Sequence, residues 1–297
     1  MSVNFGHIIV GWDGSPAAGR AVQWAARAAG HLNTPLEIIT VLEHHDDGGM
    51  TPPADGAIQE EVVHLAAARA DHLAAELRRD HPGLPVRVTA TEGDPARQLR
   101  NVSSAGDLVV LGRTGTEHRG RRHPLGAVAA DLIQDGPADV AVVPDREWDA
   151  AAPVVIGIMD PAEGNLLGEA ACAFARAGSG QILALSAWEV DALTSFNIPF
   201  TPTMMTDYHH VQERVLEHAL APVADRHPDI ALRRLTVHGN PRHSLIGATT
   251  TASLLVLGHA QRHRPWPHPQ EMGRSIVPAA RCPVLLIRHP DTVAKCA

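Results

Sequence analysis

The sequence predicts two tandem α/β domains, each with a five-stranded parallel sheet flanked by helices. Apolar, β-branched runs alternate with Ala-rich helical stretches along the chain, a pattern typical of parallel sheets buried on both faces. This pattern occurs twice. The length of 297 residues is sufficient for two domains that each bury a core. The apolar runs are all shorter than the ~18 residues that a membrane span requires, so we expect no membrane association.

The second half of the chain repeats the first at a nearly constant spacing. Three pairs of segments lie 146 residues apart: IIVGWD (8–13) with VVIGIM (154–159), EGDPARQL (92–99) with HGNPRHSL (238–245), and DLVVLG (107–112) with SLLVLG (253–258). The spacing shortens to 144 where DVAVVP (139–144) matches PVLLIR (283–288). Such self-similarity indicates an internal duplication. It predicts domains over residues 1–147 and 152–297, joined within REWDAAAP.

Each half follows the same order of strands and helices. In the first half we expect strands at HIIVGW, LEIITVL, VRVTAT, LVVLG and VAVVP. The helices between them are PAAGRAVQWAARAAGH with Pro16 near its start, a helix over 57–80, a short one after GDPARQ, and one from about Leu125. In the second half the strands are expected near 154–158, 182–187, 230–237, 254–257 and 283–288.

Composition limits the possible functions. The net charge of −8 argues against general nucleic-acid binding, which requires a basic face. The N-terminal residues do not resemble a signal peptide, so we expect a cytoplasmic protein. Cys172, Cys282 and Cys296 show no C-x-x-C spacing and are expected to be reduced and structural. Lys295 is the sole lysine, so backbone N–H groups and arginines would have to hold any phosphate.

A candidate ligand site lies in the first half, because open α/β sheets bind ligands beyond the carboxyl ends of their strands. Asp13 follows the first strand and can hydrogen-bond a ribose hydroxyl or a base nitrogen. Gly112 and Gly115 follow the fourth strand and let the backbone approach a ligand closely. The helix opening near Gly126 offers unpaired N–H groups and a positive dipole. Together these features suit a nucleotide.

Each of these features also has a purely structural interpretation. Asp13 could cap a helix or stabilise the turn in WDGSP, and the glycines could serve tight turns alone. The arginines that follow, at positions 119, 121 and 122, could contact phosphate or form a solvated loop. Histidines gather at 44–45 and at 259, 263 and 268, but neither set has the spacing of a metal site. We expect no metal beyond Mg²⁺ accompanying a nucleotide.

The motif resembles that of the universal stress protein family, specifically its tandem-domain members. The family pattern is an Asp in the first strand-to-helix turn, then G-x-x-G, nine residues, and G-S or G-T. Here Asp13 precedes G-R-T-G at 112–115, and Gly126-Ala127 follows after ten residues. The resemblance implies a Rossmann-like fold of the adenine nucleotide α-hydrolase type. Ala127 lacks the hydroxyl that would meet phosphate, which removes a hydrogen bond worth roughly 0.5–1.5 kcal/mol.

The resemblance further implies which residues would bind ATP. Asp13 and Val41 would contact the adenosine part. The segment that carries Gly112, Gly115 and Gly126 (the glycine segment) would surround the ribose and phosphates. The candidate ATP-binding residues are therefore Asp13, Val41, Gly112, Arg113, Gly115, Gly126 and Ala127. In the second half Met159 replaces Asp13, although Asp160 follows directly, and Gln261 replaces the second glycine. ATP is accordingly expected mainly in the first domain.

The implied function is noncatalytic ATP binding or sensing in a stress response. The sequence contains no nucleophile elbow, H-E-x-x-H or P-loop motif. A slow ATPase and a nucleotide-free scaffold remain as alternatives. The last strand of each half, VAVVP and PVLLIR, is expected at a sheet edge, where strands often pair with another copy. We therefore expect a homodimer or pairing of the two halves, and an unidentified protein partner.

Overall fold

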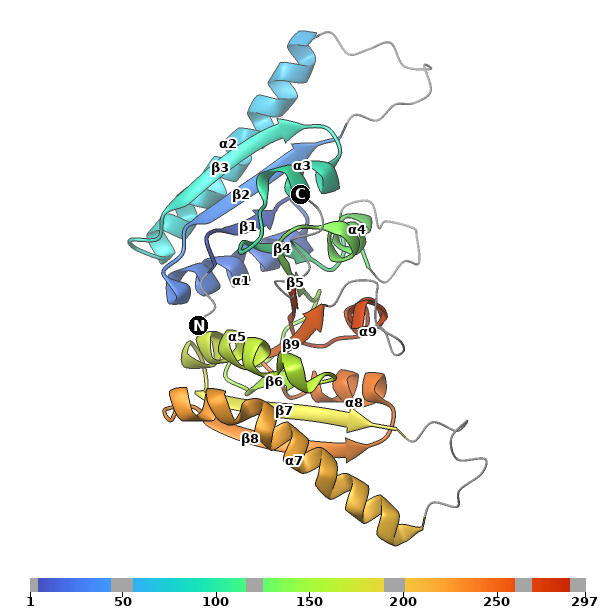
Figure 1. The fold of residues 1–297 in the computed structure, drawn as a ribbon. Coiled ribbons are helices and arrows are strands. Elements are labelled where there is room, and N and C mark those ends of the chain that lie inside the picture. The colour runs from blue at the N-terminus through green and yellow to red at the C-terminus, as the bar shows by residue number, and fades with distance from the viewer. Residues whose placement is uncertain (1–4, 44–55, 116–124, 190–200, 260–268, 289–297) are drawn as a thin grey trace. The chain divides into compact units, whose positions relative to one another are not determined.

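The chain forms two compact units in the computed structural model (Figure 1). One runs from Asn4 to Asp145 and the other from Arg146 to Ala297. The structure describes residues 5–43, 56–115, 125–189, 201–259 and 269–288. No described helix is both long enough and apolar enough to cross a membrane.

The first unit contains a five-stranded sheet in the order β3-β2-β1-β4-β5, and its strand pairs are parallel. The strands are β1 (Ile8–Gly11), β2 (Leu36–Leu42), β3 (Val86–Glu92), β4 (Leu108–Gly112) and β5 (Asp139–Val143). Ile8 is in register with Leu36 on one side and with Leu108 on the other. The strand order reverses between β1 and β4, which is the position where open sheets of this type bind ligands.

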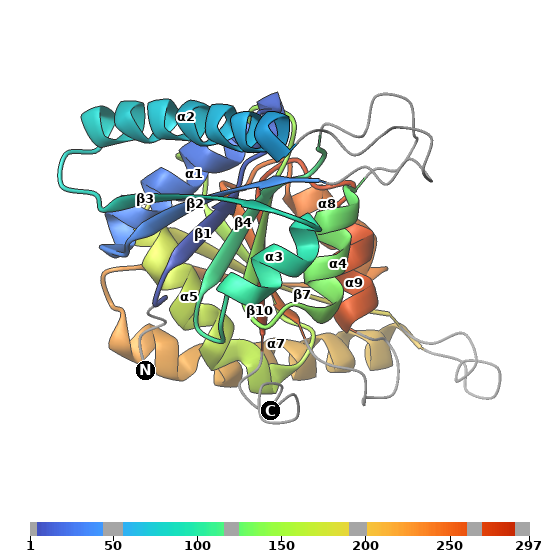
Figure 2. The ribbon, with the colours of Figure 1, turned by 90° about the horizontal axis from the view of Figure 1, so that it is seen from above.

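Helices cover both faces of this sheet (Figure 2). They are α1 (Pro16–Leu32), α2 (Gly56–Asp80), α3 (Pro95–Val102) and α4 (Ala127–Asp135). α1 and α3 each have a proline in their first turn and a side-chain N-cap. The Ser15 hydroxyl accepts the Ala18 N–H at 3.1 Å, and Asp94 accepts the Arg97 N–H at 2.7 Å. Small residues on the buried side of α1, mainly alanines, let it pack closely on the strands.

The second unit repeats this plan in the order β10-β9-β6-β7-β8. Its strands are β6 (Val154–Gly157), β7 (Gln181–Trp188), β8 (Ala231–His238), β9 (Leu254–His259) and β10 (Val284–Arg288). Its helical elements are η2 (Pro161–Glu163), α5 (Gly164–Arg176), α7 (Pro202–Arg226), α8 (Pro241–Ala248) and α9 (Pro269–Ile276). α7 and α8 each begin 146 residues after α2 and α3, the spacing found in the sequence.

The predicted α/β fold with flanked parallel sheets is confirmed. The central strands are buried on both faces; Ile8, Ile9 and Val10 are at most 1% exposed, which explains their continuous apolar sequence. Strand limits agree with the predicted ones to within a residue, except that β9 ends two residues later than predicted, at His259. The fourth helix begins at Ala127 rather than near Leu125, because Gly126 has extended backbone angles and serves as its N-cap.

Candidate functional site

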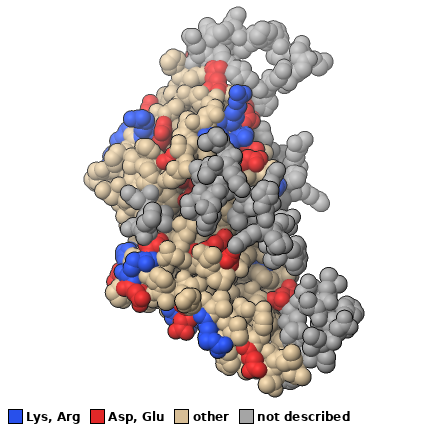
Figure 3. All heavy atoms as spheres, viewed as in Figure 1, with Lys and Arg blue, Asp and Glu red and all other residues tan. Residues whose placement is uncertain are grey.

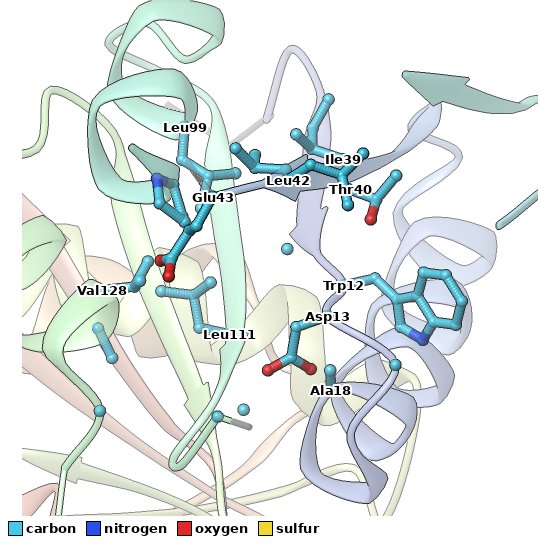
Figure 4. A pocket seen from close by; sticks show the side chains of 18 of the residues that line it. Trp12, Asp13, Ala18, Ile39, Thr40, Leu42, Glu43, Leu99, Leu111 and Val128 are labelled. Atoms are coloured by element: carbon cyan, nitrogen blue, oxygen red, sulfur yellow. The ribbon is translucent and has the colours of Figure 1, made fainter. Parts of the chain in front are cut away.

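A cavity of about 360 Å³ lies at the carboxyl ends of β1, β2 and β4 in the first unit (Figure 4). Its volume falls within the range usual for small-molecule sites. In Figure 4, Ile39, Thr40 and Leu42 line one side of it, while Asp13 and Leu111 line another. Six of the seven residues predicted to bind nucleotide line this cavity: Asp13, Val41, Gly112, Gly115, Gly126 and Ala127.

Asp13 lies in the tight turn between β1 and α1. Its Oδ1 accepts the Ser15 N–H at 2.9 Å, and Gly14 has a φ of +78°, which favours glycine. The predicted alternative role of Asp13 as a helix cap is filled by Ser15 instead. The other carboxylate oxygen, Oδ2, lies 3.0 Å from the position that a Cβ on Gly115 would occupy. The carboxylate therefore stabilises the turn with one oxygen and faces the glycine segment with the other.

At Gly112 and Gly115 the backbone lies so close to neighbouring atoms that a larger residue would not fit without movement. A Cβ on Gly112 would lie 2.8 Å from the carbonyl carbon of Ala17. The Gly126 N–H donates to the Arg113 carbonyl at 2.8 Å, which joins the two ends of this segment. The backbone is thus held close to the cavity on both sides of residues 116–124.

α4 begins directly at the cavity wall. Its first residues, Ala127, Val128 and Ala129, line the cavity, and the N–H groups of a first turn have no partner within their helix. Its N-cap, Gly126, has no side chain that could accept these bonds. The N-terminal end of a helix also carries a partial positive charge. This wall of the cavity therefore suits an anionic group.

Three charged side chains line the cavity among the described residues: Asp13, Glu43 and Arg69. Arg69 comes from α2, and its Cζ lies 5.9 Å from the ring centroid of Trp12. Neither Arg69 nor Trp12 was predicted as a site residue. Trp12 directly precedes Asp13, which could have drawn attention to it, but Arg69 has no mark in the sequence that separates it from the other arginines of α2.

Comparison with known proteins finds similarity to the universal stress protein family. The model of the universal stress protein family matches residues 4–144. A universal stress protein of Mycobacterium tuberculosis is 28% identical over 310 residues, covering 97% of this chain and 96% of that protein. One of Mycobacterium bovis is 28% identical over 303 residues, covering 95% and 97%. The first unit therefore matches the universal stress protein family, and the chain as a whole is similar to proteins of that name.

Solved structures agree with this assignment at the level of the fold. A universal stress protein from Archaeoglobus fulgidus has a TM-score of 0.65 and 13% identity, covering 95% of this chain and 98% of that one. A second, described as a putative universal stress protein from Pseudomonas aeruginosa, has a TM-score of 0.60 and 14% identity, covering 98% and 96%. Both matches extend over the two units of this chain.

Arg113, the seventh predicted residue, is not among the described residues that line the cavity. Its guanidinium donates two hydrogen bonds to Asp145 Oδ2, at 3.0 and 3.3 Å, and the two side chains are 12% and 26% exposed. An ion pair thus directs the side chain to the end of the first unit. The three arginines at positions 119, 121 and 122 lie outside the described residues.

The second unit has a different arrangement at the corresponding turn. Asp160 accepts the Ala162 N–H at 2.9 Å, as Asp13 does with Ser15, so the carboxylate is displaced by one residue along the chain. Met159 stands at the position that matches Asp13. The two turns therefore contain a similar hydrogen bond, but the carboxylate of the second unit belongs to the residue after the one that matches Asp13.

A buried glutamate, Glu163, lies next to Gly258, the glycine of the second unit that matches Gly112. A Cβ on Gly258 would overlap the carboxyl group of Glu163. In the first unit the matching Gly112 instead faces the backbone of Ala17, which lies 146 positions before Glu163. Glu163 is 5% exposed, and burial raises the pKa of its carboxyl. Its Oε2 has no hydrogen-bond partner among the described residues. The described His, Cys, Asp and Glu side chains form no group of three that could hold a metal ion.

Proposed function

We propose that the first unit binds an adenine nucleotide, with ATP as the leading candidate. The observation that carries this proposal is the cavity wall formed by the start of α4 and the glycine segment, which faces Asp13. Backbone N–H groups at a helix N-terminus can hold phosphate without a lysine. This suits a chain whose sole lysine is Lys295.

The lining residues divide into two sets that match the two parts of a nucleotide. Val41 and its neighbours on β2, together with Leu99, offer apolar contact suited to a base. Asp13 offers a carboxylate oxygen suited to a sugar hydroxyl or a base N–H. The glycines and the first amides of α4 offer donors suited to phosphates. Any Mg²⁺ would enter with the nucleotide.

In this proposal the protein is a noncatalytic nucleotide sensor of a stress response. Occupancy of the cavity would alter a surface for a second copy or another protein. The second unit would contribute to this function without holding ATP, because Met159 and Glu163 replace Asp13 and Ala17 at the matching positions. A cytoplasmic location accords with binding ATP.

A nucleotide-free scaffold is the second candidate. It is favoured by Ala127, which cannot offer the hydroxyl that the family motif has at this position. It is also favoured by the ten-residue spacing before Gly126. In such a protein the cavity would persist without a ligand, and the function would depend on the surfaces alone. Basic and acidic side chains are interspersed over the described part of the face in Figure 3, which gives no preference for a strongly charged partner.

Isothermal titration of nucleotide-stripped protein with ATP tests the proposal. We expect about one ATP per chain, and loss of binding in Asp13→Ala. Asp160→Ala is the matched control, because it removes the corresponding turn hydrogen bond in the second unit. Binding that is absent at millimolar ATP, or that disappears in the Asp160 variant and persists in the Asp13 variant, would contradict the proposal. Steady phosphate release that depends on Asp13 would instead indicate an ATPase.

A further inference from the structure

Arg69 is the one basic residue among the described residues that line the cavity. The two acidic lining residues are Asp13 and Glu43, so the described lining has more negative than positive charge. A nucleotide with several phosphates adds further negative charge to this site. A guanidinium attracts such an anionic group, the more so the closer the two approach. The positive charge of Arg69 is therefore significant for any anionic ligand of the cavity.

Arg69 lies beside the turn that joins β1 and α1. Its Nη2 lies 3.5 Å from the position of a Cβ on Gly14. The preceding residue, Asp13, has its Oδ2 3.0 Å from the position of a Cβ on Gly115. Arg69 and the glycine segment thus border the same short turn. Both the guanidinium and the glycines at 112, 115 and 126 line the cavity, so a phosphate chain that extends along the turn can meet both.

The guanidinium of Arg69 is available for a ligand. Two other arginines of the first unit form close ion pairs with carboxylates, Arg113 with Asp145 at 3.0 Å and Arg100 with Asp131 at 2.9 Å. Among the described residues no carboxylate forms an ion pair with Arg69, whose recorded contact is the ring of Trp12. A cation–π contact at an exposed residue is weak, whereas a guanidinium can bind phosphate through two parallel hydrogen bonds. Phosphate should therefore displace the indole as the preferred partner.

We propose that Arg69 binds a phosphate group of the nucleotide and thereby selects phosphorylated ligands over the nucleoside. This inference rests on the proposed nucleotide function of the first unit. The ring of Trp12 holds the guanidinium beside the cavity before a ligand enters. On binding, the planar fork turns from the ring to the phosphate oxygens. Arg69 therefore determines specificity and performs no chemical step.

Titration with both ATP and adenosine tests this assignment. Arg69→Gln should weaken ATP binding about tenfold or more, equivalent to ~1.4 kcal/mol, and change adenosine binding less than about twofold. Arg69→Lys should restore part of the ATP affinity, because it keeps the charge but lacks the planar fork. Arg79→Gln is the matched control: it lies on the same helix, is largely exposed and is not a cavity residue. It should bind both ligands as the unmodified protein does.

The two ligands separate the possible outcomes. Equal losses of ATP and adenosine affinity in Arg69→Gln would mean that the guanidinium contacts the base, and would overturn the proposal. Unchanged ATP affinity would overturn it as well, while leaving the nucleotide function intact. If the unmodified protein bound neither ligand, both the nucleotide function and the role of Arg69 would be refuted. Thermal unfolding of each variant checks that the exposed substitution leaves the fold unchanged.

Discussion

Replacing Glu163 by glutamine should stabilise the protein at neutral pH, because it removes a carboxyl group whose ionisation in the folded state costs free energy. Glu163 is 5% exposed and its Oε2 lacks a hydrogen-bond partner among the described residues. Burial raises its pKa above the ordinary value of 4.5. Below that ordinary value the folded and unfolded chains both carry the proton. As the pH rises above it, the unfolded chain releases the proton first, so the free energy of unfolding falls until the folded-state pKa is passed.

The magnitude follows from the burial of this group. A buried polar group without a partner costs about 1–3 kcal/mol, and more when it is charged. Glutamine keeps the cost of the neutral group but not the additional cost of the charge, so we expect the stability advantage of Glu163→Gln to grow as the pH rises from 4 to 8, by roughly 1.4 kcal/mol for each pH unit over which only the unfolded chain has released the proton. For a unit of this size each kcal/mol corresponds to roughly 4 °C in Tm. Thermal unfolding followed by circular dichroism at several pH values measures this difference.

A matched variant separates the effect of burial from that of charge alone. Glu217 on α7 is exposed in the same unit, so Glu217→Gln should show no comparable pH dependence. The reasoning would be refuted if the Glu163→Gln difference in Tm were the same at pH 4 and pH 8. It would also be refuted if both variants changed with pH to the same extent.

Three further predictions concern the cavity and the thiols. Gly115→Val should abolish ATP binding with little loss of secondary structure, because its Cβ alone would lie 3.0 Å from Asp13 Oδ2. Unchanged ATP affinity in calorimetry would contradict the proposal that the glycine segment binds phosphate. Ala127→Ser should tighten ATP binding up to about tenfold by adding a hydrogen bond of roughly 0.5–1.5 kcal/mol, measured in the same titration. Cys172 and Cys282 should resist alkylation at pH 7 until the protein is denatured, because burial raises their pKa values to about 11 and about 12; mass spectrometry of the native protein would detect labelling that argues otherwise.

The strands were predictable because their environment leaves a direct trace in the sequence. A strand buried on both faces must be apolar at every position, as at Ile8–Gly11 and Leu108–Gly112, so its limits can be read from composition. The duplication then located the same elements in the second half. The start of α4 was less certain, because the glycine that caps it carries no side-chain signal.

The cavity was predictable where its residues belong to a local motif, and unpredictable where they do not. Asp13 and the glycines lie directly after strands whose carboxyl ends meet at one edge of the sheet, so topology alone brings them together. Arg69 reaches the cavity only because α2 packs across it, and the direction of one side chain on a long helix depends on that packing. The ion pair of Arg113 with Asp145 likewise depends on where β5 ends.

The comparison of matching positions supports an asymmetric use of the two units. Ala17 lies at the start of α1, where its backbone approaches Gly112 and leaves no acidic group at that point. The matching Glu163 places a carboxyl group beside Gly258 at the end of β9. A phosphate approaching this strand end would have to displace the buried carboxyl group, which already occupies the space beside Gly258. The buried glutamate therefore disfavours an anionic ligand at this strand end of the second unit, independently of the glycine that Gln261 replaces in the motif.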